Sequence, residues 1–348
     1  MAELNPVENP KLTTRKEILH LLGWFFIIMI TINGLCFWYF KYYDHRDWKF
    51  LAHLKWDLLK KLNGKTDWLI LGDSSGNQSV QTDPFEKELG EKAVNLCTIG
   101  PMLTLNDSWM LDYYIKHYGK PDNVMIMHVY DMWHRDIDFE TISENPMHTV
   151  MLEDLQPGLD VPAWRKADLF VHNFVPVYYR HHALKALFTG EAKWFSTPIE
   201  LEPNGYNPRR EAMPDNVKKD TENHIKFTQD SLFRCGAYVR KGLDHVRELV
   251  DKYGFELYIT MSPLHDSLYA NPAFRKYCAG IDKLVQEFAA GNKHIHIINH
   301  PPKLFPANEM QNSDHIIDRV SGEFTRYLIG EVKKVRSGQV SPPGGSSP

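Results

Sequence analysis

Short apolar segments alternate with amphipathic helical patterns through most of this 348-residue chain, and this alternation limits the folds open to it. The segments that have the length and flanking turn residues of buried strands are residues 67–72, 92–97, 122–130, 255–262 and 294–299. Helical patterns cover residues 104–118, 231–253, 272–290 and 318–335. This alternation predicts a three-layer α/β fold, in which helices cover both faces of a parallel five-stranded sheet.

The chain between the third and fourth apolar segments departs from this rhythm over residues 132–230. This stretch is rich in His, Trp, Pro and Asn, and so long an insertion within a compact domain is usually functional. We therefore expect one domain over residues 66–335, with a long insertion after its third strand. Residues 336–348, which end in SGQVSPPGGSSP, have the composition of a disordered tail.

An uncharged apolar stretch, residues 21–40, follows an N-terminal tail of residues 1–20. A helix of about 20 residues rises about 30 Å, which matches the hydrocarbon core of a bilayer. Trp24 and Trp38 lie near the ends of the stretch, as in the aromatic belt of a membrane span. The stretch is long for a signal peptide and no small-residue cleavage site follows it. We interpret it as an uncleaved transmembrane anchor.

Lys and Arg residues flank the apolar stretch on both sides, with the excess after it. The positive-inside rule alone favours an external N-terminus, although the rule weakens where a long domain follows the span. Residues 41–65 are then predicted to form a basic amphipathic helix, because Trp48, Leu51 and Leu58 recur at helical spacing. The apolar face of this helix either lies on the membrane surface or docks on the domain.

The chain has 40 Lys and Arg residues and 44 Asp and Glu residues, which gives a net charge of −4. This balance provides no basic surface for nucleic acid. The cysteines, none of which has metal-ligand spacing, are Cys36, Cys97, Cys235 and Cys278. We expect them to be thiols of the core, and one disulfide stays open. His181 and His182 are adjacent and would point apart on a helix, so no metal site is expected there.

Residues suited to chemistry follow the carboxyl ends of the predicted strands. Ser74, Gly100, Asp131, His265 and His315 come after the first to the fifth strand in that order. In an open parallel sheet these ends share one edge, where ligands bind. A serine and a histidine at this edge favour a nucleophile at Ser74, with Ser75 as the alternative, over residues that only form a turn.

Three sequence blocks around these positions resemble those of the SGNH/GDSL hydrolase superfamily over residues 66–335. The matching residues are Gly72-Asp73-Ser74 after the first strand, Asn95 and Gly100 in NLCTIG, and His315 before the final helix. The resemblance implies that Ser74 attacks an acyl carbon while His315 acts as base and then as acid. It also implies that the backbone N–H groups of Ser74 and Gly100 bind the oxyanion.

Two departures from the family pattern affect this site. Tyr130 stands where the third block has the oxyanion Asn, so its hydroxyl would be the donor. Asn312 stands three residues before His315, where the family has the orienting Asp. Asn312, Asp314 or Asp131 would then orient the imidazole. A site that has lost its activity is the alternative.

The remaining polar residues of the blocks are expected substrate contacts, namely Asp73, Asn95, Asp131 and His265. For Asp73 a structural role, as an acid that accepts hydrogen bonds, is favoured over a catalytic one. His265 is also open to a second interpretation, as an ordinary loop residue after the fourth strand.

A single anchor joined to such a domain resembles the membrane-anchored members of the superfamily, such as the alginate O-acetylation proteins and the D-alanyl transfer protein of teichoic acid modification. The resemblance implies that a membrane-bound O-acyltransferase supplies an acyl group, Ser74 carries it, and a cell-surface polysaccharide or related polymer accepts it. It places the domain on the outer, periplasmic side of a bacterial cytoplasmic membrane and implies no cofactor. An anchored carbohydrate esterase and an inactive glycan-binding or scaffold subunit are the alternatives.

Overall fold

The computed structural model describes residues 15–42, 50–138, 141, 163–181, 184–185, 189, 199, 201–229 and 232–339. The chain divides into two compact units, a smaller one of residues 1–45 and 170–196 and a larger one of residues 46–169 and 197–348. Residues 142–162 of the predicted insertion, His182, and residues 340–348 of the predicted tail lie outside the described residues.

The larger unit is built on a parallel five-stranded sheet, which confirms the predicted fold class. Its strands are β1 (Trp68–Gly72), β2 (Ala93–Asn95), β3 (Asn123–His128), β4 (Glu256–Met261) and β6 (Ile295–Ile298). They lie in the order β2-β1-β3-β4-β6, which is consistent with a flavodoxin-like or SGNH-like fold. The order reverses between β1 and β3, and ligands of such sheets bind beyond the carboxyl ends of the strands at this point.

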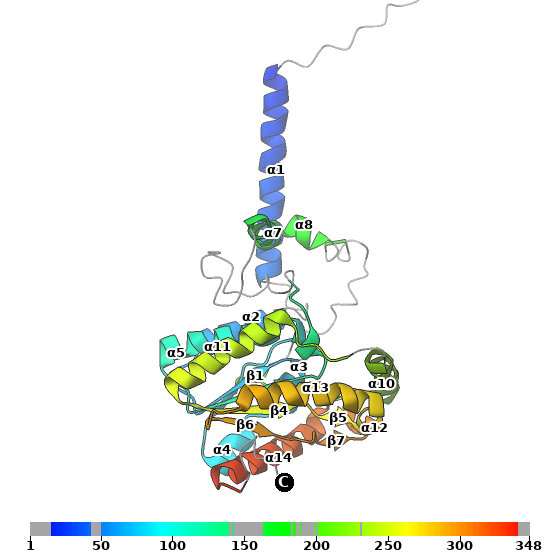
Figure 1. The fold of residues 1–348 in the computed structure, drawn as a ribbon. Coiled ribbons are helices and arrows are strands. Elements are labelled where there is room, and N and C mark those ends of the chain that lie inside the picture. The colour runs from blue at the N-terminus through cyan, green and yellow to red at the C-terminus, as the bar shows by residue number, and fades with distance from the viewer. Residues whose placement is uncertain are drawn as a thin grey trace, which may run out of the picture. The chain divides into compact units, whose positions relative to one another are not determined.

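Alternate residues of the strands face two separate apolar cores, because successive side chains of a strand point to opposite faces. Leu69 and Val124 belong to one core, and Ile70 and Met125 to the other. The helices over the first core are α5 (Leu103–Tyr118), α11 (Ala237–Tyr253) and α13 (Pro272–Ala289), and those over the second are α4 (Asp83–Leu89) and α14 (Asp318–Arg336). Figure 1 shows α5 and α11 side by side above the sheet and α14 below it. The strands therefore appear as continuous apolar segments in the sequence.

The helices of the described residues that were not predicted include α3 (Ser74–Ser79), α4, α10 (Pro214–Gln229) and α12 (Asp266–Ala270). The predicted helix over residues 231–253 begins only at Ala237, because Gly236 is extended and its N–H donates to Trp133 O at 3.0 Å. The third strand ends at His128, two residues before its predicted end. It ends there because the N–H of Val129 donates to the Asp73 carboxylate, at 2.8 Å, rather than to a neighbouring strand.

The amphipathic sequence before the domain forms α2 (Phe50–Lys60), whose apolar face packs on α5 within the larger unit. Leu51, Trp56 and Leu59 are buried in the first core, and Trp56 Nε1 donates to Asn106 Oδ1 at 3.0 Å. This burial corresponds to the docked arrangement of the helix rather than to an apolar face left free for a membrane surface.

The smaller unit contains α1 (Arg15–Tyr42), which includes the predicted span, and α8 (Pro176–Tyr179); α7 (Ala163–Phe174) includes the boundary of the two units. α1 is long and apolar enough to cross a membrane, judged by its length and composition. Its apolar side chains are largely exposed. A signal anchor and a signal sequence share these properties.

Candidate active site

Ser74 is the first residue of α3 and follows β1 after a sharp turn. The turn requires glycine at position 72, where φ is +135° and a Cβ atom would lie 1.8 Å from Met127 O. Asp73 caps the helix by accepting a hydrogen bond from Ser75 N at 3.0 Å. Ser74 is thus presented at the carboxyl end of β1, beside the point where the strand order reverses.

His315 lies on a small antiparallel hairpin of β8 (Met310–Asn312) and β9 (His315–Ile316). Several hydrogen bonds with other segments hold this hairpin in place, among them those of Ser75 and His265. Ser75 Oγ donates to Asp314 O at 2.9 Å, and His265 N donates to Ser313 O at 2.8 Å. The first of these bonds holds the hairpin against the helix that carries Ser74.

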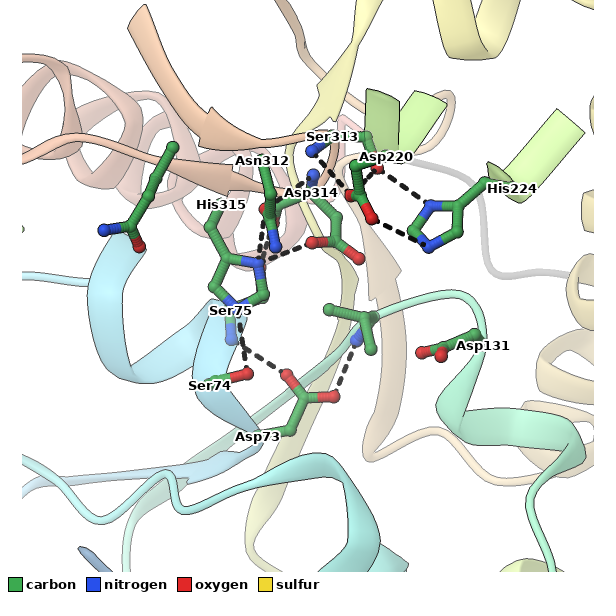
Figure 2. Close-up of polar contacts among 12 residues, drawn as sticks. Asp73, Ser74, Ser75, Asp131, Asp220, His224, Asn312, Ser313, Asp314 and His315 are labelled. Atoms are coloured by element: carbon green, nitrogen blue, oxygen red, sulfur yellow. Dashed lines mark hydrogen bonds and ion pairs between the residues drawn. The ribbon is translucent and has the colours of Figure 1, made fainter. Parts of the chain in front are cut away.

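Ser74 and His315 are in hydrogen-bond contact. His315 Nε2 lies 2.8 Å from Ser74 Oγ, while Nδ1 lies 2.5 Å from Asp314 Oδ1 and 2.8 Å from Asn312 Oδ1. Figure 2 shows the imidazole between Ser74 on one side and Asp314 and Asn312 on the other. Both partners of Nδ1 are acceptors, so Nδ1 carries the proton and Nε2 is free to accept from the Ser74 hydroxyl.

The buried carboxylate of Asp314 is ionised. Burial raises the pKa of Asp314, but His315, with smaller contributions from His224 and Arg135, outweighs burial and lowers the pKa below the ordinary value. Burial lowers the pKa of His315, but Asp314, with smaller contributions from Asp73 and Asp220, outweighs burial and raises it. Of the three orienting residues considered in the sequence, Asn312 and Asp314 therefore contact the imidazole together, and Asp314 supplies the charge.

A cavity of about 430 Å³ opens at Ser74 and His315. Gly100, the first residue of the 3₁₀ helix η1 (Gly100–Met102), lines it, as do Asn312, Asp314 and Asp131. The backbone N–H groups of Ser74 and Gly100 have no acceptor among the described residues. They are two donors available at one cavity, as an oxyanion site needs.

Asp73 is fully buried and makes contacts within the protein. Its carboxylate accepts from the N–H of Ser75 and of Val129 and faces His128 Nδ1 at 3.2 Å. The other ring nitrogen of His128 lies 2.5 Å from Asp107 Oδ2. Burial would lower the pKa of His128, but the two carboxylates outweigh it and raise the pKa to about 9, so the ring is an imidazolium. Asp73 is therefore a structural acid in this arrangement.

Other residues named from the sequence are not brought to the cavity. Asn95 is buried and donates to Gly76 O and Val80 O, which ties the second strand to α3. Tyr130 packs edge-on against Phe274, and neither it nor His265 is among the described residues that line the cavity. Tyr130 thus occupies the sequence position of an oxyanion donor without lying at the oxyanion.

Four ionisable residues of the cavity were missed in the sequence, and these four lie within the insertion. Arg135 and Arg209 line the cavity, as do Asp220 and His224 of α10. Asp220 accepts hydrogen bonds from the N–H and the hydroxyl of Ser313, in the turn of the hairpin that carries His315. The unusual length of the insertion was the only signal, because none of these residues belongs to a motif.

The described part of the chain holds no group of three or more His, Cys, Asp or Glu side chains placed to bind a metal. The four cysteines are free thiols, of which Cys97 and Cys278 are buried and Cys36 and Cys235 partly exposed.

Protein-family models were compared with the chain and none matches, and no curated protein matches it either.

Proposed function

We propose that the larger unit is a serine acyl-transfer enzyme of the SGNH hydrolase type, with Ser74 as nucleophile. The observation that carries this proposal is the 2.8 Å contact between Ser74 Oγ and His315 Nε2, in a ring whose other nitrogen faces an ionised Asp314. A nucleophile, a base and an orienting acid in hydrogen-bond contact are the arrangement by which serine is activated.

In the first step, Ser74 Oγ bonds to the acyl carbon and its proton passes to His315 Nε2. The π electrons of the carbonyl become a lone pair on the oxyanion, which the N–H groups of Ser74 and Gly100 would bind. The oxyanion then collapses, the bond to the leaving group breaks, and the leaving group takes the proton from His315. An acceptor hydroxyl repeats these steps in reverse and releases Ser74.

The proposed donor and acceptor come from the resemblance of the anchored domain to envelope acyltransferases. A membrane-bound O-acyltransferase would supply the acyl group, and a hydroxyl of a cell-surface polysaccharide or related polymer would accept it. The apolar helix α1 supports this proposal, because its length and composition suit a membrane anchor. The catalytic unit would lie on the outer, periplasmic side of a bacterial cytoplasmic membrane.

A second candidate is an anchored carbohydrate esterase, in which water takes the place of the polymer hydroxyl. The same three side chains serve both reactions, and the cavity at Ser74 has room for water or a sugar hydroxyl. An inactive glycan-binding or scaffold subunit is disfavoured by the close contact of Ser74 and His315.

Labelling with a fluorophosphonate probe tests the proposal. We expect the full-length protein in detergent to be labelled at Ser74, and Ser74→Ala and His315→Ala to lose the label. Ser267→Ala, at an exposed serine on α12, is the matched control and should label like the wild type. A folded wild-type protein that takes no label, with and without the membrane fraction, would overturn the enzyme proposal.

Protease digestion of intact spheroplasts tests the orientation. A catalytic unit on the outer side is degraded without lysis, whereas a unit protected until lysis contradicts the proposed location.

Addition of oligosaccharide acceptors to the acylated protein distinguishes acyl transfer from hydrolysis. Transferase function predicts an acylated sugar, and loss of the acyl group to water alone favours the esterase.

A further inference from the structure

The site has two backbone donors for the oxyanion and no side-chain donor at the position where the sequence places Tyr130. The Tyr130 ring centroid lies 4.6 Å from that of Phe274, in the core beneath α13. Removal of one oxyanion donor from a serine enzyme slows it by about 10²–10³-fold. A third donor would therefore have a large effect, and the side chains that line the cavity are the ones to consider.

Arg135 lies against Gly100 in the cavity. A Cβ atom on Gly100 would be 3.2 Å from Arg135 Nη1 and 3.6 Å from its Cζ, so the guanidinium packs over the residue whose N–H is an oxyanion donor. Ser74, Gly100 and Arg135 line the same cavity. The guanidinium therefore faces the same cavity as the two backbone donors.

The geometry points to Arg135 as the third, cationic donor to the acyl oxygen at Ser74, in the place that the resemblance gives to a neutral side chain. This inference rests on the proposed function, and it names a catalytic residue that no sequence block contains. The Nη1 group would donate to the oxyanion while the positive charge stabilises its negative charge.

The position of Arg135 is fixed at both ends. Its backbone N–H donates to Met132 O at 3.0 Å, and its backbone O packs so closely on Gly236 that a Cβ there would be 2.0 Å away. At the tip, Nη2 donates to Asp131 Oδ2 at 2.5 Å. Nη1 has no acceptor among the described residues, which leaves it for a ligand. A fixed donor needs little reorganisation when charge develops in the transition state.

The charges around Arg135 keep it protonated. Burial lowers its pKa, but Asp131, together with Asp73 and Asp314, outweighs burial and raises the pKa. Asp131 does not cancel the effect of the cation, because it bonds to Nη2 and leaves the other terminal nitrogen free. The side chain is 34% exposed, so water screens its charge in part. We therefore expect the rate loss on its removal to lie at the lower end of the range of about 10²–10³-fold for oxyanion donors.

The test compares variants of Arg135 in the full-length protein by two rates, acylation by p-nitrophenyl acetate and labelling of Ser74 by a fluorophosphonate. Arg135→Gln keeps amide donors without the charge, and Arg135→Ala removes both. We expect both rates to fall about 100-fold in Arg135→Ala and less in Arg135→Gln. The loss should lie in the acylation rate constant, with KM little changed, and guanidinium ion should partly restore Arg135→Ala.

Arg247→Gln is the matched control. Arg247 also pairs with an acid four residues away, Asp251, and is similarly exposed, but it lies on α11 and does not line the cavity. We expect its labelling rate within about twofold of the wild type, because its contacts, with Asp251 and with the backbone O of Phe288 and Ala290, all lie away from the cavity. Thermal unfolding of each variant reports whether the fold is kept.

The outcomes separate this inference from the proposed function. A wild type that does not label overturns the proposed function itself. A wild type that labels, with Arg135→Ala folded and equally fast, overturns the role of Arg135 alone. A variant with a raised KM and an unchanged acylation rate constant would also overturn it, because Arg135 would then contribute to binding of the substrate and not to stabilisation of the oxyanion.

Discussion

Replacement of Asp314 by asparagine distinguishes the contributions of the two side chains, Asp314 and Asn312, that accept a hydrogen bond from Nδ1 of His315. Asp314→Asn keeps the size of the side chain and removes its charge. The link between the hairpin and α3 survives, because Ser75 Oγ bonds to the backbone O of Asp314 rather than to its carboxylate. The substitution therefore tests the charge without moving the loop.

The expected magnitudes differ between Asp314 and Asn312. An uncharged residue in place of the orienting acid of a serine triad lowers the rate by about 10⁴-fold, so we expect about 10³–10⁴-fold for Asp314→Asn. Asn312→Ala removes a neutral hydrogen bond of 2.8 Å, which contributes about 0.5–1.5 kcal/mol, or about 2–12-fold in rate. The loss in Asp314→Asn should thus exceed that in Asn312→Ala by about two orders of magnitude or more.

The pH dependence supplies a second measure. His315 acts as a base only when neutral, and Asp314 raises its pKa above the ordinary value of 6.5. The acid limb of kcat/KM should therefore lie above pH 6.5 in the wild type and move to lower pH in Asp314→Asn.

The assay is hydrolysis of p-nitrophenyl acetate from low to high pH, with fluorophosphonate labelling as an independent rate. Asp122→Asn is the control, an exposed acid that pairs with Lys65 at the amino end of β3, and it should behave like the wild type. Equal losses in Asn312→Ala and Asp314→Asn, or an acid limb that does not move, would refute this assignment of the orienting charge.

Two buried cations should change stability with pH in opposite senses. His128 has its pKa raised to about 9, so between pH 6.5 and 9 the folded state binds more protons and its stability falls as pH rises, by up to about 3 kcal/mol. Burial lowers the pKa of Lys55 to about 7, so between pH 7 and 10.5 the unfolded state binds more protons and stability rises with pH. Urea unfolding should show stability falling from pH 7 to 9 in Lys55→Met and rising over that range in His128→Gln. Gly72→Ala places a Cβ atom 1.8 Å from Met127 O at a φ of +135°, so we expect a loss of about 3 kcal/mol or more in the same assay and no soluble protein if the loss exceeds the total stability. Two outcomes would contradict these assignments. One is a stability that changes with pH by the same slope in Lys55→Met and His128→Gln, and the other is a urea midpoint of Gly72→Ala equal to that of the wild type.

The sheet was predictable because its strands are buried on both faces. Segments such as 67–72 are apolar without interruption, and the amphipathic helices between them have clear periods. The helix that carries Ser74 was not predictable, because SSGNQS has no apolar period and forms a helix only through its Asp73 cap and its contacts.

The pairing of Ser74 with His315 was also predicted from the sequence, because each of these two residues follows the carboxyl end of a predicted strand. The residues around it were not. Arg135 and Asp220 reach the cavity from an irregular segment and from α10, and no local pattern reports such tertiary placement. Tyr130 shows the converse. It has the sequence position of an oxyanion donor, but a large ring next to Phe274 is stabilised more by the apolar core than by a wet cavity.

The separation of the two reacting residues along the chain affects when the enzyme can first act. Ser74 and His315 are 241 residues apart, and the bond from Ser75 to Asp314 that joins their segments spans 239. A growing chain that has emerged as far as α13 has its serine and no base. Under the proposed mechanism such a chain cannot form an acyl-serine, so Ser74 would stay unreactive while the protein is synthesised. Acylation at Ser74 is therefore a direct readout that the last hairpin has docked, and it could be used to time the end of folding in a cell.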